Sequence, residues 1–333
     1  KDNMNYTPLN DFPRKYNMNS DSVKEKIRIL ITGSTGFVGK AIKNELEKTE
    51  LYDIYEMSKH VGVDLCSDKA IDDFFKYEYP SFSYIFHCAV ASNTYSDTKY
   101  STINDNLINF NILKMWNERF PQAKFISFGS DACYSDIFPH TEEHFFSGIP
   151  NSFYFNYAMA KRNMVAELMK HVEYGNRYLV FIPSSLYGSG FDFRDSHLIH
   201  DLIKKLFTLK NNPISTDLLK ISKSIGLAQR ETVYIDDFVK NVLSISFDDK
   251  IYNTIFNLGS LKLFTISEYV KMLCDIIGID FFSLKFGTMD DLGSNKKYLD
   301  SSYAKQCLIH YHDAPIRETL EKTVQYFKSI STL

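Results

Sequence analysis

The sequence lacks any run of about 18 apolar residues, so it has no segment long enough to cross a membrane as a helix. It has only five cysteines, an odd and widely spaced set without a Cys-x-x-Cys pair or a Cys/His cluster of zinc type. These absences exclude a disulfide scaffold and predict no metal site. They favour a reducing compartment, and we expect the cytoplasm.

An excess of charge of one sign is also absent. The 38 basic and 41 acidic side chains leave a formal net charge of −3. Such a balance argues against a protein that binds nucleic acid through bulk charge. Residues 1–25 are polar and lack the apolar core of a signal peptide, so we expect a flexible or surface-draped extension.

What is present is an alternation of apolar strands and amphipathic helices in a chain of 333 residues, long enough to bury a sizeable core. Strands are expected at 27–32, 53–58, 84–90, 124–129 and 178–183, and helices at 37–46, 104–119 and 154–174. This order predicts an α/β fold, a Rossmann-type doubly wound parallel sheet covered on both faces.

The alternation loosens after residue 183, where helices are expected at 197–209 and 265–277 and strands at 232–235 and 255–258. We therefore expect a smaller C-terminal substrate lobe interleaved with the first domain. The dinucleotide-binding domain would comprise residues 26–182 and about 220–258. The substrate lobe would comprise about 183–219 and 259–333.

Three glycines spaced three apart, Gly33, Gly36 and Gly39, separate the first strand from the first helix. A pyrophosphate can meet backbone N–H groups at such a turn, although a tight turn with close helix packing would need the same glycines. The stretch resembles the T-G-x-x-G-x-x-G fingerprint of the extended short-chain dehydrogenase/reductases. The expected cofactor-binding residues here are Gly33, Thr35, Gly36, Phe37, Val38 and Gly39.

The end of the second strand indicates which dinucleotide binds, because an acidic residue there would bind the 2′-hydroxyl of NAD. Ser58 and Lys59 stand at this place and suit a 2′-phosphate, which favours NADP(H), with NAD(H) possible. Glu56 would be the acidic residue if the strand register were shifted by two. Asp64 and Leu65 resemble the pair that flanks the adenine in the family, although Asp64 could instead cap the next helix.

A tyrosine and a lysine four residues apart lie on one face of a helix, where the ammonium lowers the pKa of the phenol. The chain contains three such pairs, at Tyr55/Lys59, Tyr95/Lys99 and Tyr157/Lys161. Only the last begins a strong helix, and it follows a strand that ends in Ser130. This order of motifs resembles the short-chain dehydrogenase/reductases over residues 26 to about 260, and implies catalytic roles for Ser130, Tyr157 and Lys161.

Further segments resemble the nucleotide-sugar enzymes of this superfamily, above all the GDP-L-fucose synthase family. Residues 182–188 (IPSSLYG) resemble the segment that contacts the nicotinamide, and 195–199 (DSHLI) resemble the segment that carries a catalytic histidine. Residues 229–237 and 296–300 resemble the segments that bind the diphosphate side of the sugar nucleotide. The resemblance implies His197 as a catalytic acid, although a histidine at a helix start is often a cap. It implies cofactor contacts from Ala89, Pro183 and Ser185, and substrate contacts from Ser130, Ser185, His197, Lys205, Arg230 and Lys297.

One departure from the family concerns Gly-Ser-Ser-Cys, whose cysteine is the base for epimerisation at C3 and C5. This chain has Gly-Ser-Asp-Ala, with Cys133 one residue later. A shift of one residue in an extended segment moves a side chain to the opposite face, so we expect Cys133 to be buried and epimerisation to be lost.

The sequence therefore predicts an NADPH-dependent oxidoreductase that reduces the C4 keto group of a GDP- or CDP-linked 4-keto-6-deoxy hexose or heptose, in deoxysugar biosynthesis for surface polysaccharide. The alternatives are a bifunctional 3,5-epimerase/4-reductase, a nucleotide-sugar 4-epimerase and a non-catalytic NADP-sensing regulator. The expected partners are the nucleotide sugar and a second copy of the chain in a homodimer, with no nucleic acid and no membrane.

Overall fold

The computed structural model describes residues 25–77, 79, 81–91, 101–136, 140–193, 197–212, 226–284 and 296–331. The expected N-terminal extension up to residue 24, the pair Tyr95/Lys99 and residues 195–196 lie outside these ranges. Within them, no helix is both long enough and apolar enough to span a bilayer.

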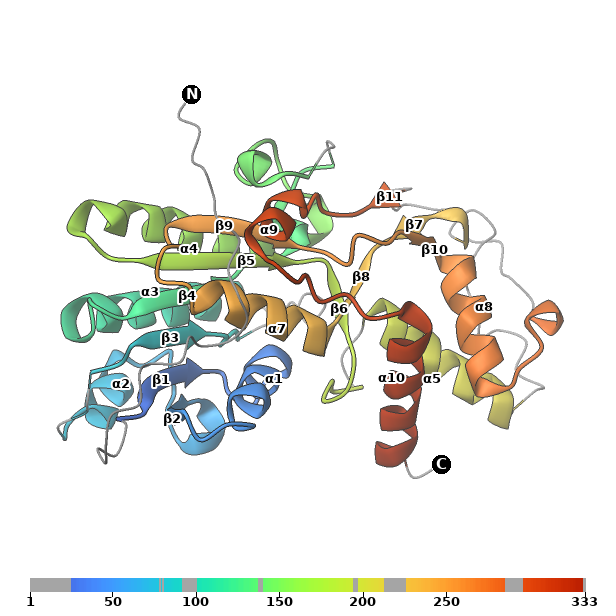
Figure 1. Cartoon of the computed structure of the whole chain (residues 1–333), viewed down its shortest axis with the longest axis horizontal. Coiled ribbons are helices and arrows are strands. Elements are labelled where there is room, and N and C mark those ends of the chain that lie inside the picture. The colour runs from blue at the N-terminus through green and yellow to red at the C-terminus, as the bar shows by residue number, and fades with distance from the viewer. Residues whose placement is uncertain are drawn as a thin grey trace.

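A six-stranded parallel sheet forms the larger part of the molecule (Figure 1). Its strand order is β2-β1-β3-β4-β5-β9, and every neighbouring pair is parallel. The strands are β1 (Ile27–Thr32), β2 (Tyr52–Met57), β3 (Tyr84–His87), β4 (Lys124–Phe128), β5 (Tyr178–Pro183) and β9 (Thr254–Leu258). The predicted Rossmann-type sheet is confirmed, and its order reverses beside β1, where such folds place a ligand.

Helices cover both faces of this sheet because successive side chains of each strand point to opposite sides. Leu30 belongs to the core formed with α2 (Asp68–Phe74), α3 (Ser101–Arg119) and α4 (Phe155–His171). Its neighbours Ile29 and Ile31 belong to the core formed with α1 (Phe37–Leu46), α7 (Ile235–Ser246) and α9 (Ser302–Cys307). Apolar residues at consecutive strand positions thus supply two cores.

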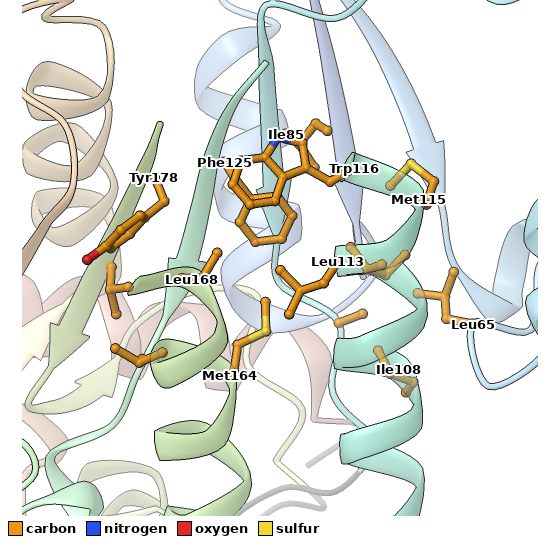
Figure 2. Packing of buried hydrophobic residues seen from close by; sticks show 14 of the residues in the cluster. Leu65, Ile85, Ile108, Leu113, Met115, Trp116, Phe125, Met164, Leu168 and Tyr178 are labelled. Atoms are coloured by element: carbon orange, nitrogen blue, oxygen red, sulfur yellow. The ribbon is translucent and has the colours of Figure 1, made fainter. Parts of the chain in front are cut away.

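The first of these cores centres on Trp116 of α3, whose ring packs against Phe125 of β4 (Figure 2). Met164 and Leu168 of α4 line the same layer. The indole Nε1 donates a hydrogen bond of 3.0 Å to the carbonyl oxygen of Ala123, so the one buried polar atom of the side chain is paired. This packing fixes α4, which carries the Tyr-x-x-x-Lys pair, against the sheet.

A third core lies outside the large sheet, between α5 (Leu198–Asn211), α8 (Ile266–Ile277) and α10 (Ile316–Ile330). These helices gather at the right of Figure 1, beside two small sheets. One sheet has the order β10-β7-β11 and the other pairs β6 with β8. Their strands are β6 (Ser185–Tyr187), β7 (Gln229–Arg230), β8 (Thr232–Tyr234), β10 (Phe264–Thr265) and β11 (Lys296–Lys297).

The predicted elements are present with shifted ends, whereas the helices α2, α7 and α10 were not predicted. The second strand covers Tyr52–Met57 and leaves Ser58 just beyond it. The helix expected at 154–174 ends at His171, where Val172–Tyr174 tighten into a 3-10 turn and Gly175 takes a positive φ of 78°. Such a left-handed glycine is a common helix terminator, and it lies one residue past the predicted end.

Candidate active site

The glycine turn joins β1 to α1 with almost no space for side chains. Gly33 has a φ of +67°, and a Cβ there would lie 2.6 Å from the backbone of Ala89. A Cβ on Gly39 would lie 2.2 Å from the carbonyl oxygen of Gly33, whereas one on Gly36 would meet the same oxygen at 3.4 Å. Gly33 and Gly39 are thus required by the fold itself, and Gly36 is the one whose missing side chain leaves room for a ligand.

The turn fits the pyrophosphate of a dinucleotide. It places the N-terminus of α1 at the carboxyl ends of β1 and β3, and the first N–H groups of a helix have no partner within it. Thr35 is exposed at the tip of the turn, and Phe37 and Val38 begin the helix half-buried. Ala89, nine per cent exposed, closes the opposite side.

The residues predicted to select the dinucleotide lie beyond the end of β2. Lys59 is exposed in the short 3-10 turn Lys59–Val61. The hydroxyl of Ser58 is buried and has no hydrogen-bond partner among the described residues. Glu56, the alternative acidic residue, is held by Lys43 at 2.6 Å. Lys59 and His60 are therefore exposed at this strand end, whereas the predicted cofactor contact Ser58 has its hydroxyl buried.

Asp64 and Leu65 lie in the loop between β2 and α2. The Asp64 carboxylate accepts a hydrogen bond of 3.1 Å from the backbone N–H of Cys66. It does not cap α2, because Ser67 is the N-cap and accepts from the N–H of Ala70. Leu65 is five per cent exposed and belongs to the first core. The alternative in which Asp64 caps the following helix is thus wrong.

Ser130, Tyr157 and Lys161 are placed by β4 and α4. Ser130 lies two residues past the end of β4, and its Oγ accepts a hydrogen bond of 3.2 Å from the N–H of Ala132. Tyr157 and Lys161 share one face of α4, with Lys161 Nζ 5.9 Å from the centre of the tyrosine ring. The predicted helical pairing of these two side chains is present.

Lys161 lies in a partly buried environment at the carboxyl edge of the sheet. Burial lowers the pKa of Lys161, and the carboxylate of Asp105 on α3 opposes this shift. Asp105 also accepts a hydrogen bond of 2.7 Å from the N–H of Ala91, which follows β3. Burial lowers the pKa of the His87 imidazole at the end of β3, and the positive charge of Lys161 lowers it further. Burial raises the pKa of the next residue, the Cys88 thiol, and the charge of Lys161 opposes this rise. The ammonium therefore lies between α4, Asp105 of α3 and the end of β3, the strand that pairs with β1.

Cys133 is fully buried, as expected, but it lies in the 3-10 turn Asp131–Cys133 and not in the extended segment on which that expectation rested. Its Sγ donates to the carbonyl oxygen of Ala158 at 3.8 Å, and burial raises the pKa of the thiol to about 11. Ala132, which occupies the position of the family's cysteine, is four per cent exposed. A thiol this buried and this weakly acidic is a poor base near neutral pH.

Arg162 is a site residue that sequence reasoning missed. Its guanidinium is buried and donates hydrogen bonds to the carbonyl oxygens of Cys133, Ser147 and Gly148. It thereby joins the helix of Tyr157 and Lys161 to the turn that follows Ser130. No local pattern in the sequence distinguishes this arginine from a surface one.

The segment after β5 contacts the glycine turn through aromatic rings. Phe37 at the start of α1 meets Phe191 edge-on at 5.2 Å, and Phe191 stacks on the imidazole of His200 at 3.6 Å. His197 occupies the N-cap position of α5, as the alternative of a helix cap expects, but its side chain makes no capping hydrogen bond. Its ring lies 5.0 Å from that of Phe191. His197 is therefore linked to the glycine turn through the ring of Phe191.

The other residues of this segment lie along β5, β6 and α5. Pro183 ends β5 and Ser185 begins β6, and both are partly exposed. Lys205 is partly exposed on α5. Pro183 and Ser185 lie at the carboxyl end of the sheet, the edge at which β1 meets the glycine turn.

The two predicted substrate cations lie side by side. Arg230 of β7 and Lys297 of β11 are direct partners in a parallel strand pair. Glu231 follows β7, is four per cent exposed and accepts hydrogen bonds of 3.0 Å from the N–H groups of Leu261 and Leu299. Burial raises the pKa of the Glu231 carboxyl to about 7. This carboxylate was not predicted as a site residue.

The geometry combines a dinucleotide turn, a Ser/Tyr/Lys set and a pair of cations along one edge of a Rossmann sheet, and residues 29–259 match the NAD dependent epimerase/dehydratase family. The chain belongs to this family. The predicted likeness to the extended short-chain dehydrogenase/reductases is thereby confirmed, and this epimerase/dehydratase is an NAD(P)-dependent oxidoreductase.

Curated relatives of this epimerase/dehydratase span almost its whole length. It is 25% identical over 314 residues to a GDP-L-fucose synthase of Dictyostelium discoideum, covering 91% of this chain and 95% of the relative. It is 27% identical over 318 residues to a GDP-L-colitose synthase of Yersinia pseudotuberculosis, covering 90% and 98%.

Solved structures share the fold. A GDP-L-fucose synthetase of Naegleria fowleri bound to NADP superposes with a TM-score of 0.79 at 23% identity, over 93% of this chain and 95% of the other. A GDP-6-OMe-4-keto-L-xylo-heptose reductase of C. jejuni superposes with a TM-score of 0.76 at 20% identity, over 92% and 99%. Such likenesses confirm the Rossmann-type architecture of the epimerase/dehydratase.

Proposed function

We propose that this epimerase/dehydratase is an NADPH-dependent 4-ketoreductase of a nucleotide-linked 4-keto-6-deoxy sugar, a GDP- or CDP-linked hexose or heptose used in deoxysugar biosynthesis for surface polysaccharide. The observation that carries the choice of reduction alone is Ala132, which leaves the position of the family's epimerisation base without a titratable group. The thiol of Cys133 is turned into the core instead. The GDP-sugar synthases and the heptose reductase named above support this substrate class.

The proposed chemistry places a proton donor and a hydrogen-bond donor at the keto oxygen. NADPH, when bound, supplies the hydride. Tyr157 gives its proton to the oxygen of the reduced carbon, and Ser130 donates a hydrogen bond to the same oxygen. Lys161 lowers the pKa of Tyr157 through its charge and holds the nicotinamide ribose, while His197 binds the substrate from the start of α5.

Cofactor choice is proposed from the end of β2. Lys59 is exposed there and suits a 2′-phosphate, whereas Glu56 is already paired with Lys43. The glycine turn, Asp64, Leu65 and Ala89 would contact the dinucleotide, with Pro183 and Ser185 near the nicotinamide. NADH remains the weaker alternative.

The substrate lobe is proposed to bind the sugar nucleotide through Arg230, Lys297 and Lys205. Arg230 and Lys297 lie at paired positions of β7 and β11, and charge-assisted hydrogen bonds from two such cations suit a diphosphate. The third core of α5, α8 and α10 supports a separate lobe within the proposed ranges of about 183–219 and 259–333. Helix α9 lies inside the second range but packs in the core of the large sheet, so we propose that it belongs with the dinucleotide domain.

A homodimer is proposed from an apolar stripe on α3. Ile103, Leu107 and Phe110, spaced on one face of the helix, are 57%, 43% and 43% exposed. Met169 of the neighbouring α4 is 48% exposed. Sedimentation of the wild type at the mass of two chains, and of a Leu107→Asp variant at the mass of one, would support this assembly.

We also propose a cytoplasmic location, in keeping with five cysteines that form no disulfide.

A substrate screen tests the proposed function. GDP-, CDP-, UDP- and dTDP-linked 4-keto-6-deoxy sugars are each supplied with NADPH, and the product is analysed by NMR. Tyr157→Phe is expected to lower kcat by about a hundredfold to ten-thousandfold while NADPH still binds. Tyr174→Phe, at an exposed tyrosine just after the same helix, is the matched control and should keep the wild-type rate. A Tyr157→Phe enzyme as fast as the wild type would contradict the mechanism.

The same assay separates the alternatives. Solvent deuterium at C3 or C5 of the product would support a 3,5-epimerase/4-reductase. Conversion by enzyme that retains NAD and needs no added reductant would support a 4-epimerase. Binding of NADP without turnover of any sugar nucleotide would support a regulatory protein, for which the Ser/Tyr/Lys set has no use.

A further inference from the structure

Lys297 lies beside the catalytic turn although β11 is remote from it in sequence. Its Nζ is 3.0 Å from Oδ2 of Asp131, the residue after Ser130. The same ammonium lies 5.5 Å from the ring centre of Tyr154, one turn before Tyr157 on the chain. One cation of the lobe therefore touches both segments that carry the proposed catalytic groups.

The position of Lys297 is fixed by its backbone. The carbonyl oxygen of Lys297 accepts a hydrogen bond of 3.1 Å from the N–H of Glu231, and the Glu231 carboxylate accepts one from the N–H of Leu299. A Cβ on Gly259 would lie 2.3 Å from this carboxylate, so the packing around it is close. The backbone is thus fixed at Lys297 and Leu299, and the ion pair with Asp131 holds the ammonium.

The pair formed by Asp131 and Lys297 is partly withdrawn from water. The side chain of Asp131 is 17% exposed and that of Lys297 is 29% exposed. The attraction between the two charges is stronger there than between fully hydrated side chains. The other carboxylate oxygen of Asp131 lies 3.4 Å from the hydroxyl of Ser130, a long and weak contact.

Arg230 favours the exchange of the Asp131 carboxylate for a more highly charged anion at Lys297. It faces Lys297 across the strand pair, and two like charges at facing positions repel each other. The carboxylate of Asp131 brings one negative charge to this pair. A diphosphate brings more negative charge and enough oxygen atoms to contact both cations at once, so it is the stronger partner.

We propose that Asp131 is an intramolecular counter-ion of Lys297 that the diphosphate of the substrate has to displace. The inference rests on the proposed function, because it takes a nucleoside diphosphate as the occupant. Before substrate binds, the carboxylate of Asp131 holds the Lys297 side chain in place and balances its charge. Because this ion pair has to be broken, the measured affinity for the diphosphate is weaker than it would be without Asp131. Asp131 stands where the resembling family has a serine, so this competition is a property of this chain.

Calorimetric titration of GDP into the NADPH-loaded protein tests the inference, with CDP, UDP and dTDP titrated in parallel. Asp131→Asn keeps the shape of the side chain and removes its charge, and should bind the best of these diphosphates about threefold to tenfold more tightly. Lys297→Met should bind it more weakly. In the double variant, Asp131→Asn should bring no gain, because the cation that it frees is gone.

Asp72→Asn is the matched control, since it removes the same charge from another ion pair, with Arg119 at 2.6 Å. It should leave the diphosphate affinity unchanged. Asp131→Ser is a second variant that should also bind more tightly. NADPH binding verifies that each variant is folded, and a merely structural role of Asp131 would weaken diphosphate binding instead of strengthening it.

The outcomes separate the two proposals. Diphosphate binding to the wild type without a gain in Asp131→Asn and Asp131→Ser, or with an equal gain when Lys297 is absent, would overturn the counter-ion role alone. NADPH binding without binding of any of the four diphosphates would overturn the proposed substrate class and the counter-ion role with it.

Discussion

Arg162 donates two hydrogen bonds to the carbonyl oxygen of Cys133, from Nε at 3.0 Å and from Nη2 at 2.7 Å. The arginine follows Lys161 on α4, and the cysteine ends the short turn that begins after Ser130. The distance between the Ser130 hydroxyl and the Tyr157 phenol therefore depends on a side chain that touches neither. Its guanidinium also holds the loop at Ser147 and Gly148.

Arg162→Met is expected to lower both stability and turnover. The variant leaves buried carbonyl oxygens without donors, which costs about 2–4 kcal/mol of unfolding free energy. Urea unfolding measures this cost. Steady-state kinetics should show a larger loss in kcat than in the KM for NADPH, because the glycine turn is not touched. Wild-type turnover in the folded variant would show that Ser130 is positioned by other contacts.

Gly39→Ala and Gly36→Ala should separate folding from cofactor binding. The new Cβ of Gly39→Ala meets the Gly33 carbonyl oxygen at 2.2 Å, so the turn must shift and stability should fall by about 1–3 kcal/mol. The Cβ of Gly36→Ala meets it at 3.4 Å, so this variant should fold like the wild type yet bind NADPH less tightly. Thermal unfolding and NADPH fluorescence measure the two effects. Equal NADPH affinity of wild type and Gly36→Ala would place the pyrophosphate elsewhere.

Lys59→Ala should raise the KM for NADPH about tenfold and leave the KM for NADH unchanged, because only NADPH carries the 2′-phosphate. Lys69→Ala removes an exposed lysine from the neighbouring helix α2 and is the control. The ratio of kcat/KM for the two cofactors measures the preference. A wild type that prefers NADH would refute the role proposed for Lys59.

His87 should make the protein less stable in acid. Its imidazole lies between the Thr32 hydroxyl at 2.7 Å and the Asn109 side chain at 2.9 Å, and burial lowers its pKa to about 4. The unfolded chain binds a proton at the ordinary histidine pKa of about 6.5, so stability is complete above that pH and is lost as pH falls towards 4. This histidine contributes a loss of about 2 kcal/mol at pH 5.

His87→Gln is expected to flatten this pH dependence. The side chain of glutamine can still form hydrogen bonds but takes up no proton in this range. Urea unfolding of both proteins between pH 7.5 and 5 measures the difference in slope. Parallel stability curves for wild type and variant would mean that the His87 ring is protonated as easily in the folded protein as in the unfolded chain.

The strands of the large sheet, the helices α1, α3, α4, α5 and α8, the glycine turn and the Tyr157/Lys161 pair were predictable from the sequence alone, whereas α2, α7 and α10 were missed. Each predicted feature depends on spacing over a few residues: apolar runs that form buried strands, glycines between a strand and a helix, and a four-residue step along a helix. The burial of Cys133 was also predicted, but for a reason that the structure does not support. Residues Asp131–Cys133 form a 3-10 turn instead of an extended segment, and Ala132 and Cys133 are both buried.

Only the tertiary structure decided which groups each charged side chain pairs with, through ion pairs and hydrogen bonds. Lys124 begins β4, and lysines are rarely buried. Its ammonium nevertheless donates hydrogen bonds to the carbonyl oxygens of Ser246, Asp248 and Ile251 in the interior. The contacts of Arg162, Glu231 and the pair Asp131/Lys297 likewise join segments that are remote along the chain. No periodic pattern in the sequence predicts the partner of a charged side chain, because the packing of the helices and strands determines which groups meet. The sequence thus determined the scaffold and the reacting groups, and packing determined the ionic contacts that position them.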